Sequence, residues 1–287
     1  MKIFLAKDAG YCFGVRDAVN LAYETAKDEG DVYMLGTIVH NENVIEDLSK
    51  AGTKIVKSLD QIPKEKPVLF RAHGTHKAVW QEAKKKNLRI IDATCPLVTE
   101  IHDEIKKLDA EGRKIIIIGD HGHDEVIGIL SQVSNPIVIS NVEEAKALRK
   151  MKKAGVVTQS TQMLQNVQNI MNTLMTKVYD LRFVNTICFP TRRNHEQIIE
   201  LAAQCEVMIV IGSFTSANSK RLTQMALKLN KRTYQVKSVE DLEPSWFINC
   251  ETVGISAGAS TPDYIIDSVL KKIKVIGNVA EEETIYE

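Results

Sequence analysis

Cys12, Cys95 and Cys188 occupy related positions in the sequence, which makes them candidates for a shared ligand role. Each follows a short apolar run and precedes a stretch with a helical pattern, and successive members are 83 and 93 residues apart. Three thiolates could hold zinc or an iron–sulfur cluster. Structural zinc usually takes four ligands and brings cysteines close together in sequence, whereas no C-x-x-C pair occurs here. A cubane cluster with three protein thiolates leaves one iron open to activate a ligand, so the pattern favours a catalytic cluster.

The other positions of chemical interest recur with the same spacing. A glycine ends a strand-like run 24 residues after each of the three cysteines, at Gly36, Gly119 and Gly212. Four residues beyond these glycines stand His40, His123 and Ser216, and six beyond them stand Glu42, Glu125 and Asn218. A third loop recurs late in each repeat, around His73, Ser160 and Ser260. We interpret the pattern as three copies of one unit, at residues 13–94, 96–187 and 189–274. An N-terminal strand at 1–12 and a C-terminal tail at 275–287 would flank them.

Continuous apolar runs alternate with amphipathic stretches along the whole chain, as in KIIIIG followed by HDEVIGILSQV. This alternation predicts an α/β fold with parallel sheets buried on both faces. In such folds the functional groups gather beyond the carboxyl ends of the strands, where the recurring loops would lie. We expect the three units to pack around a pseudo-threefold axis, which would bring one cysteine from each to the centre.

The recurring loops also predict an anion site. Histidines, hydroxyls and an amide lie at or near predicted helix starts, where free backbone N–H groups and the helix dipole favour anions. A phosphate or diphosphate is the natural ligand, although the pattern does not exclude a carboxylate. Glu125 is either a favourable acidic residue at a helix start or a proton donor beside the cluster. The equivalent Glu42 is interpreted only as a helix-start residue, and His102 and His195 as surface or hydrogen-bonded side chains.

Composition narrows the class of protein. The 287 residues suggest two or three domains, and 37 basic residues balance 37 acidic ones, which argues against a nucleic-acid-binding protein. No apolar run approaches the roughly 20 residues of a membrane span, and the N-terminal sequence lacks the features of a signal peptide. The cysteines are widely spread and odd in number, which favours a reducing cytoplasm over a disulfide framework. Cys205 and Cys250 lie outside the repeat and are expected to be core residues.

In its motifs the chain resembles the IspH/LytB family, the 4-hydroxy-3-methylbut-2-enyl diphosphate reductases. The resemblance covers nearly the whole length and rests on these segments in order: AGYCFGVRDAV, LGTIVHN, RAHGTHK, DATCPLV, GHDEV, TQST, NTIC, GSFTSANSKRL and SAGASTPD. It implies three α/β domains in a trefoil around a [4Fe–4S] cluster, with one open iron and with Cys12, Cys95 and Cys188 as ligands.

The resemblance also implies a reaction and a set of site residues. The enzyme would reduce 4-hydroxy-3-methylbut-2-enyl diphosphate to isopentenyl and dimethylallyl diphosphates, the last step of the non-mevalonate (MEP) pathway, by two single-electron transfers. Glu125 would supply a proton, assisted by the hydroxyls of Ser160 and Thr161. The diphosphate would contact a larger set of positions: His40, His73, His123, Ser216, Asn218 and Ser260. Because no ferredoxin motif or flavin fingerprint is present, electrons would come from an external donor such as ferredoxin or flavodoxin.

The sequence departs from the family pattern at a few positions. Ser160 stands where a threonine is common, Ala217 where a second serine is common, and Asn194-His195 where an Arg-Gln pair is usual. The last departure affects the expected packing behind Cys188. Two other functions are considered: a non-redox three-cysteine cluster enzyme of the quinolinate-synthase type, and an iron–sulfur sensor. No output domain or basic patch supports a sensor.

Overall fold

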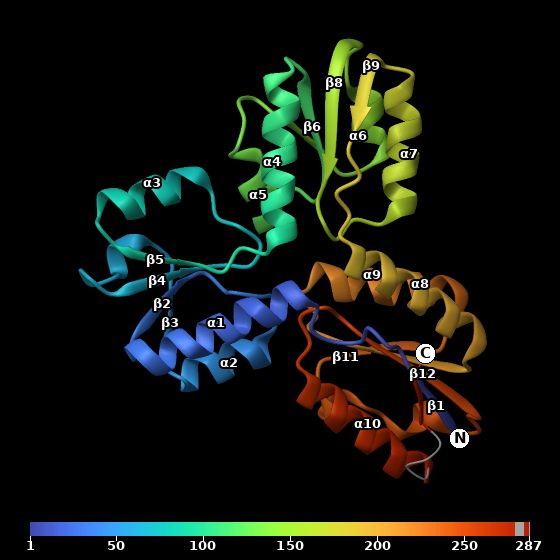
Figure 1. Cartoon of the computed structure of the whole chain (residues 1–287). Helices are drawn as coiled ribbons and strands as arrows, with labels where there is room; N and C mark the ends of the chain where they lie inside the picture. The colour runs from blue at the N-terminus through green and yellow to red at the C-terminus, as the bar shows by residue number, and fades with distance from the viewer. Residues whose placement is uncertain (279–283, 287) are drawn as a thin grey trace. The chain divides into compact units, whose positions relative to one another are not determined.

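The computed structural model describes residues 1–278 and the backbone of residues 284–286. The chain divides into two compact units. The first unit contains Met1–Arg16, His40–Ile45 and Phe189–Glu287, and the second contains Asp17–Val39 and Glu46–Cys188. Each unit is built from parallel strands and helices, so the predicted α/β class is confirmed (Figure 1). The repeat boundaries at 13–94, 96–187 and 189–274 stay a prediction.

The first unit contains one parallel sheet with the strand order β11-β10-β12-β1-β13. Its strands are β1 (Lys2–Leu5), β10 (Val207–Ile211), β11 (Thr233–Val236), β12 (Thr252–Ala257) and β13 (Thr284–Tyr286). Its helices are α8 (Phe189–Gln204), α9 (Ala217–Leu229) and α10 (Asp263–Gly277), with the short 3₁₀ helices η2 (Val239–Asp241) and η3 (Pro244–Phe247). The predicted N-terminal strand is β1, which pairs with both β12 and β13. Part of the C-terminal tail is therefore a strand, whereas residues 279–283 and 287 lie outside the described residues.

Helices cover both faces of the sheet at strand β10, which explains why its sequence, VMIVI, is apolar throughout. Val207, Ile209 and Ile211 pack in a core cluster that includes α10, while Met208 and Val210 pack with α8 and α9 on the opposite face. Side chains alternate between the faces of a strand, so a sheet covered on both sides requires apolar residues at every position. Cys205 is buried in the second cluster, as expected for a core cysteine. Cys250 is half-buried, and its Sγ contacts the Thr252 carbonyl oxygen at 3.3 Å.

The second unit contains two parallel sheets, with strand orders β3-β2-β4-β5 and β7-β6-β8-β9. The first of these has β2 (Val32–Leu35), β3 (Thr53–Val56), β4 (Pro67–Phe70) and β5 (Arg89–Asp92). The other has β6 (Lys114–Ile118), β7 (Ile137–Ile139), β8 (Met151–Thr158) and β9 (Val178–Phe183). The accompanying helices are α3 (Lys77–Lys85), α4 (Pro96–Ala110), α5 (Asp124–Leu130), α6 (Val142–Ala147) and α7 (Leu164–Met175), with η1 (Leu59–Gln61). Helices α1 (Phe13–Glu29) and α2 (Glu42–Lys50) begin in the first unit and continue in the second.

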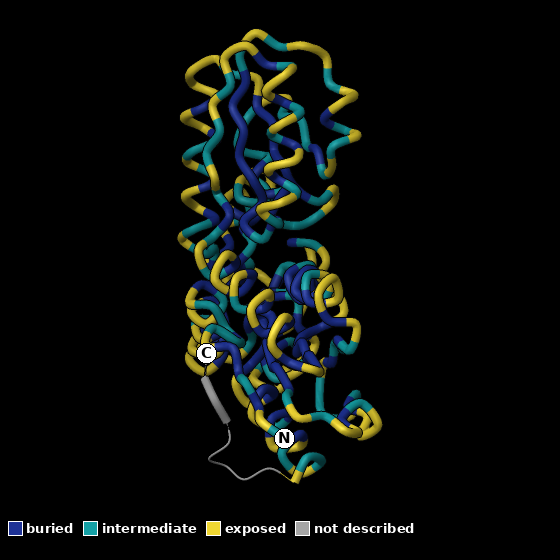
Figure 2. Tube along the Cα trace, turned by 90° about the vertical axis from the view of Figure 1, so that its right-hand side faces the viewer, coloured by how far each residue is buried: buried dark blue, intermediate teal, exposed yellow. Residues whose placement is uncertain are grey.

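The same alternation organises the β7-β6-β8-β9 sheet. Ile115 and Ile117 of β6 pack in a cluster with α4 and α5, and Ile116 and Ile118 pack in a cluster with α6 and α7. Buried residues accordingly follow the strands, while the helices alternate between buried and exposed positions (Figure 2). Among the described residues, no helix has both the length and the apolar character needed to cross a membrane.

The parallel strands place the predicted site loops at helix starts. The segments that follow the three cysteines are helical, as their patterns predict, and the helices begin at Phe13, Pro96 and Phe189. The His123 and Ser216 loops each lead from the carboxyl end of a strand into a helix, α5 and α9 respectively. The fold therefore positions these residues where α/β proteins commonly bind ligands.

Leu108 provides a test of the packing between α4 and β8. It is fully buried, and a Cβ added at Gly155 of β8 would lie 2.9 Å from Leu108 Cβ, so the two elements are in close contact. We expect Leu108→Ala to lower the free energy of unfolding by about 2–5 kcal/mol, because it leaves a cavity in this contact. Urea denaturation measures the change. Leu164→Ala, at a position 43% exposed on α7, is the control and should change stability by no more than about 0.5 kcal/mol. Equal stability of the two variants would contradict this packing.

Candidate active site

The three cysteines have the same backbone environment. The Cys95 N–H donates to the Ala72 carbonyl at 3.0 Å, the Cys188 N–H to the Ser160 carbonyl at 3.0 Å, and the Cys12 N–H to the Ala259 carbonyl at 3.3 Å. Each acceptor belongs to the third recurring loop, the one that carries His73, Ser160 or Ser260. Each cysteine also stands immediately before a helix, where the helix dipole favours a thiolate. All three residues are half-buried.

Within the second unit, Glu125 and Ser160 form a buried acid–hydroxyl pair. The Ser160 N–H donates to Glu125 Oε1 at 2.6 Å, and the Ser160 hydroxyl donates to Oε2 at 2.7 Å. Glu125 is only 1% exposed, so these bonds offset part of the cost of burying a carboxyl group. Both carboxyl oxygens have a fixed position, which is required of a group that transfers a proton. Thr161 lies in the same loop and accepts a hydrogen bond from Gln159 Nε2 at 3.1 Å.

His123 lies next to this pair and determines how α5 begins. Its Nδ1 accepts a hydrogen bond from the Glu125 N–H at 3.2 Å, which leaves Nε2 as the N–H of a neutral imidazole. The His123 and His73 rings are in edge-to-face contact, with centroids 5.7 Å apart. The second unit thus brings together four predicted site residues: His73, His123, Glu125 and Ser160.

The first unit gathers the remaining predicted diphosphate contacts. Ser216 is the N-cap of α9, where its Oγ accepts a hydrogen bond from the Ser219 N–H at 3.3 Å. The Ser260 hydroxyl donates to the His40 carbonyl at 3.3 Å. Asn218 is buried, and neither its Oδ1 nor its Nδ2 has a hydrogen-bond partner within the described part of the chain. A buried amide in this state costs about 1–3 kcal/mol, which is consistent with a group that awaits a polar ligand.

The predicted site residues are therefore assembled in two groups, one in each unit. His40, Ser216, Asn218 and Ser260 lie in the first unit with Cys12, and the others lie in the second unit with Cys95 and Cys188. Within the described residues of either unit, no group of three or more His, Cys, Asp or Glu side chains could hold a metal ion by itself. A single pocket around a three-cysteine centre stays a prediction, because its ligands come from both units.

Sequence reasoning missed one residue of the first unit, Glu42. Its carboxylate accepts hydrogen bonds from the hydroxyls of Ser213 and Thr215, at 2.8 and 3.1 Å. It is therefore more than a helix-start residue. Its position in the repeat, equivalent to that of Glu125, was the available signal.

His195 is buried and His102 is half-buried, so neither is a surface residue. Nε2 of each imidazole is buried and has no hydrogen-bond partner among residues that the structure describes. His102 contacts the backbone near the His73 loop, since its Cε1 would lie 3.1 Å from a Cβ added at Gly74. Burial, together with the positive charge of Lys106 and of Arg221 respectively, lowers the pKa of each histidine to about 4.

Two further histidines, His76 and His121, make structural contacts. His76 is the N-cap of α3, and its Nδ1 accepts a hydrogen bond from the Ala78 N–H at 3.1 Å. His121 Nε2 lies 2.8 Å from Glu144 Oε2. Burial tends to raise the pKa of Glu144, but hydrogen bonds from His121 and Ser140 outweigh it and hold the pKa at about 2.

The structure places each departure from the family pattern in a defined local setting. Ser160 keeps the hydroxyl that bonds Glu125. Ala217 is the first residue of α9, directly after the capping Ser216. Asn194 and His195 are both buried on α8, the helix that begins after Cys188, so they form part of the packing there.

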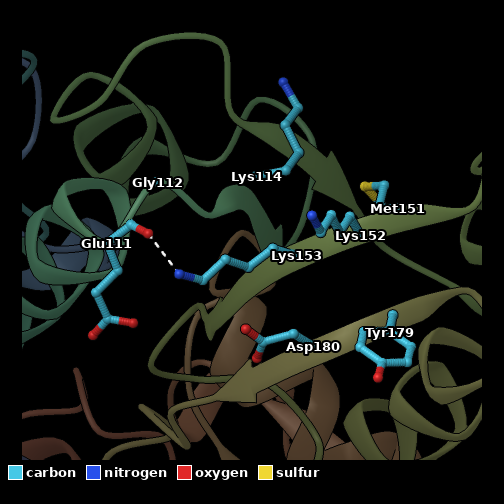
Figure 3. A pocket seen from close by; sticks show the side chains of 8 residues that line it. All are labelled: Glu111, Gly112, Lys114, Met151, Lys152, Lys153, Tyr179 and Asp180. Carbon is cyan, nitrogen blue, oxygen red and sulfur yellow. Dashed lines mark hydrogen bonds between the residues drawn. The ribbon is translucent and has the colours of Figure 1, made fainter.

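A cavity of about 700 Å³ in the second unit is lined by none of the predicted site residues. It is lined by residues at and just before the amino ends of β6, β8 and β9, among them Lys114, Lys153 and Asp180 (Figure 3). The lysine ammonium groups bond backbone carbonyls, as in the 2.8 Å bond from Lys153 to Glu111. The candidate site is at the opposite, carboxyl ends of the strands, so this cavity is not part of it.

The fold and these contacts define an α/β protein of the kind that binds its ligand at the carboxyl ends of parallel strands. The model of the protein family described as LytB protein matches residues 3–274 of this chain. The chain belongs to the LytB family.

Relatives and solved structures agree with this assignment. A protein of Geobacter sulfurreducens named 4-hydroxy-3-methylbut-2-enyl diphosphate reductase is 39% identical over 279 residues, which are 97% of this chain and 99% of the relative. A Geotalea uraniireducens protein of the same name is 40% identical over 277 residues, or 96% and 98% of the two chains.

Among solved structures, that of an (E)-4-hydroxy-3-methyl-but-2-enyl diphosphate reductase, described as the terminal enzyme of the non-mevalonate pathway, is similar with a TM-score of 0.71 and 35% identity. The similarity covers 96% of this chain and 100% of that one. The E-1-hydroxy-2-methyl-but-2-enyl-4-diphosphate reductase of Plasmodium falciparum gives a TM-score of 0.93 at 26% identity, over 100% of this chain and 92% of its own.

The buried His195 predicts how stability depends on pH. Its pKa is about 4 in the folded protein and about 6.5 in an unfolded chain, so the unfolded chain binds more protons between these values. The free energy of unfolding should therefore fall as the pH decreases from about 6.5 to 4, and His195 should account for about 2–3 kcal/mol of this loss. We expect His195→Gln, which cannot titrate, to remove that share in urea denaturation at matched pH values. Glu196→Gln, an exposed neighbour on α8, should keep the wild-type dependence. The same pH dependence in His195→Gln and in the wild type would contradict the assignment.

Proposed function

We propose that this chain is a 4-hydroxy-3-methylbut-2-enyl diphosphate reductase, an oxidoreductase that forms isopentenyl and dimethylallyl diphosphates in the last step of the non-mevalonate pathway. The observation that carries the proposal is the buried Glu125–Ser160 pair beside His123 and His73, in a chain 39% identical over nearly its full length to proteins of that name. Replacing the substrate's C–O bond with a C–H bond consumes two electrons and two protons and releases water. The site must therefore bind a diphosphate, admit electrons and deliver protons.

Cys12, Cys95 and Cys188 would hold a [4Fe–4S] cluster. Their chemistry fits, because each thiol stands at a helix start and its backbone is bonded to a site loop. When bound, such a cluster supplies single electrons and one open iron that can coordinate the substrate hydroxyl. The protein's own part is to fix these thiols relative to the loops that contact the substrate.

The diphosphate would be bound by the histidines and hydroxyls of the recurring loops: His40, His73, His123, Ser216, Asn218 and Ser260. The buried amide of Asn218 supports this role, since a phosphate oxygen would provide the partner that its Nδ2 lacks among the described residues. Ser216 is the N-cap of α9, where free N–H groups favour an anion.

Glu125 would deliver the protons that the reaction consumes. Its carboxyl group is buried, and two hydrogen bonds from Ser160 fix its orientation. Ser160 would orient the acid, and Thr161, in the same loop, would assist the transfer. Burial of the pair also limits the access of bulk water.

An external protein would supply the electrons, because the sequence contains neither a ferredoxin motif nor a flavin fingerprint. A ferredoxin or a flavodoxin fits this need. Such a donor and the wide spread of an odd number of cysteines along the sequence both favour the cytoplasm. The non-redox dehydratase considered from the sequence has no support from the relatives, which are named as reductases.

Turnover under anaerobic conditions tests the proposal directly. Cluster-reconstituted protein, reduced with dithionite, should convert 4-hydroxy-3-methylbut-2-enyl diphosphate to the two five-carbon diphosphates while consuming two electrons per product. Product analysis and reductant oxidation are measured together. A fully loaded cluster without turnover would reject the proposal, and carboxylate substrates of the dehydratase class would then be examined.

Glu125→Gln separates proton delivery from binding. The amide keeps the size of the side chain but cannot donate an acidic proton, so kcat should fall by about 10²–10⁴-fold. Iron content and KM should stay within about threefold of the wild type, because the cysteines and the diphosphate contacts are unchanged. Glu143→Gln, at an exposed carboxylate of α6, is the control. Full turnover in Glu125→Gln would remove Glu125 from the mechanism.

A further inference from the structure

Glu42 joins two loops of the first unit that are far apart in sequence. Its Oε1 accepts hydrogen bonds from the hydroxyls of Ser213, at 2.8 Å, and Thr215, at 3.1 Å. The Thr215 N–H donates in turn to Ser213 Oγ at 3.0 Å, so the turn is itself ordered around the carboxylate. Glu42 is the first residue of α2, two residues after His40, and Thr215 directly precedes the N-cap Ser216. The carboxylate therefore connects the His40 loop with the start of α9.

Further contacts strengthen the same connection. The Asn43 side chain donates to the Lys237 carbonyl at 3.4 Å, and Ser260 donates to the His40 carbonyl at 3.3 Å. Asn41 is buried and caps α2, since its Oδ1 accepts from the Asn43 N–H at 3.0 Å. The start of α2 is thus bonded both to its own helix and to the loops of the first-unit sheet.

The division of the chain follows these contacts. The segment His40–Ile45 belongs to the first unit, although the residues on both sides of it, up to Val39 and from Glu46, belong to the second. Local sequence does not explain this placement, because Ser213 is 171 residues away from Glu42. The hydrogen bonds of Glu42, Asn43 and Ser260 do explain it.

The charge of the Glu42 carboxylate gives further information on its role. Desolvation tends to raise its pKa, but hydrogen bonds from Ser213, Thr215 and its own backbone, with the charge of Lys237, outweigh this and lower the pKa. The group is therefore a carboxylate at neutral pH. A negative charge near a diphosphate is electrostatically unfavourable, so its presence here indicates a role other than contact with the ligand.

We propose that Glu42 is a positioning residue, which holds His40 at a fixed separation from Ser216 and Asn218 in the diphosphate site. This inference rests on the proposed function. The hydroxyls of Ser213 and Thr215 occupy both lone pairs of Glu42 Oε1, so this oxygen binds the loops and not the substrate. Its counterpart Glu125, at the same position of the second repeat, bonds Ser160 in the proton-delivery site.

Three variants of the cluster-loaded protein test the role. Glu42→Ala removes the acceptor, Glu42→Gln keeps an acceptor oxygen without the charge, and Glu46→Ala removes an exposed carboxylate one turn along α2 that pairs only with Lys50 in the described structure. We expect Glu42→Ala to raise the KM for the diphosphate substrate about tenfold, with kcat per cluster within about twofold of the wild type. Glu42→Gln should restore KM to within about threefold, and Glu46→Ala should match the wild type.

Hydrogen exchange of the same proteins, read by mass spectrometry, supplies a measurement that does not depend on turnover. Glu42→Ala should accelerate exchange in both 38–45 and 213–219, because each loop loses its partner. Unchanged exchange in both segments, or an unchanged KM in Glu42→Ala, overturns the positioning role. A loss of kcat and iron content at constant KM would indicate general destabilisation and also overturns it. If the wild type binds and converts no diphosphate, the proposed function fails, while the exchange result still decides whether Glu42 joins the loops.

Discussion

Hydrogen bonding between the ends of neighbouring parallel strands is the constraint on which the candidate site depends. Parallel pairing brings β1 beside β12, β5 beside β4 and β9 beside β8, so the loops after each pair leave the same edge of a sheet. In every pair the N–H of a cysteine donates to a carbonyl in the neighbouring loop. Because these bonds use only the main chain, the three loops can carry different side chains and still hold a cysteine in the same relation to each.

Because the side chains of the three loops can differ, residues at one position of the repeat can have different partners. Six residues after the repeat glycine stand Glu42, Glu125 and Asn218. Glu125 is buried and bonds Ser160 of its own unit, Glu42 is exposed and bonds the turn before α9, and Asn218 presents an unsatisfied amide. The backbone places each residue at a helix start, and the neighbouring loop then decides its partners, from which the roles that we propose as acid, positioning group and ligand contact follow.

The features that depend on local sequence pattern could be predicted from the sequence alone. Continuous apolar runs predicted the parallel sheets, and the helical patterns after the three cysteines predicted the helices that begin there. The sequence was insufficient where contacts are distant in the chain. Periodicity cannot show that Ser213 reaches Glu42, or that His195 is enclosed beside Arg221, because such contacts depend on the packing of whole elements. The family pattern suggested a departure at Asn194-His195 without revealing that both side chains are buried.

Buried polar groups without hydrogen-bond partners are of two kinds in the described residues: some lie where we propose that the ligand binds, and others lie within the packed structure. In the described residues, Asn218 and Ser219 at the start of α9 are unsatisfied, as are Nε2 of His102 and of His195. Each such group costs about 1–3 kcal/mol, and the continuous apolar cores of the sheets offset that cost. A bound diphosphate would satisfy Asn218 but not His195, which lies within the helix layer. In the function that we propose, the first cost would be recovered on binding. The second persists in every state, so stability should depend on the neutral form of His195.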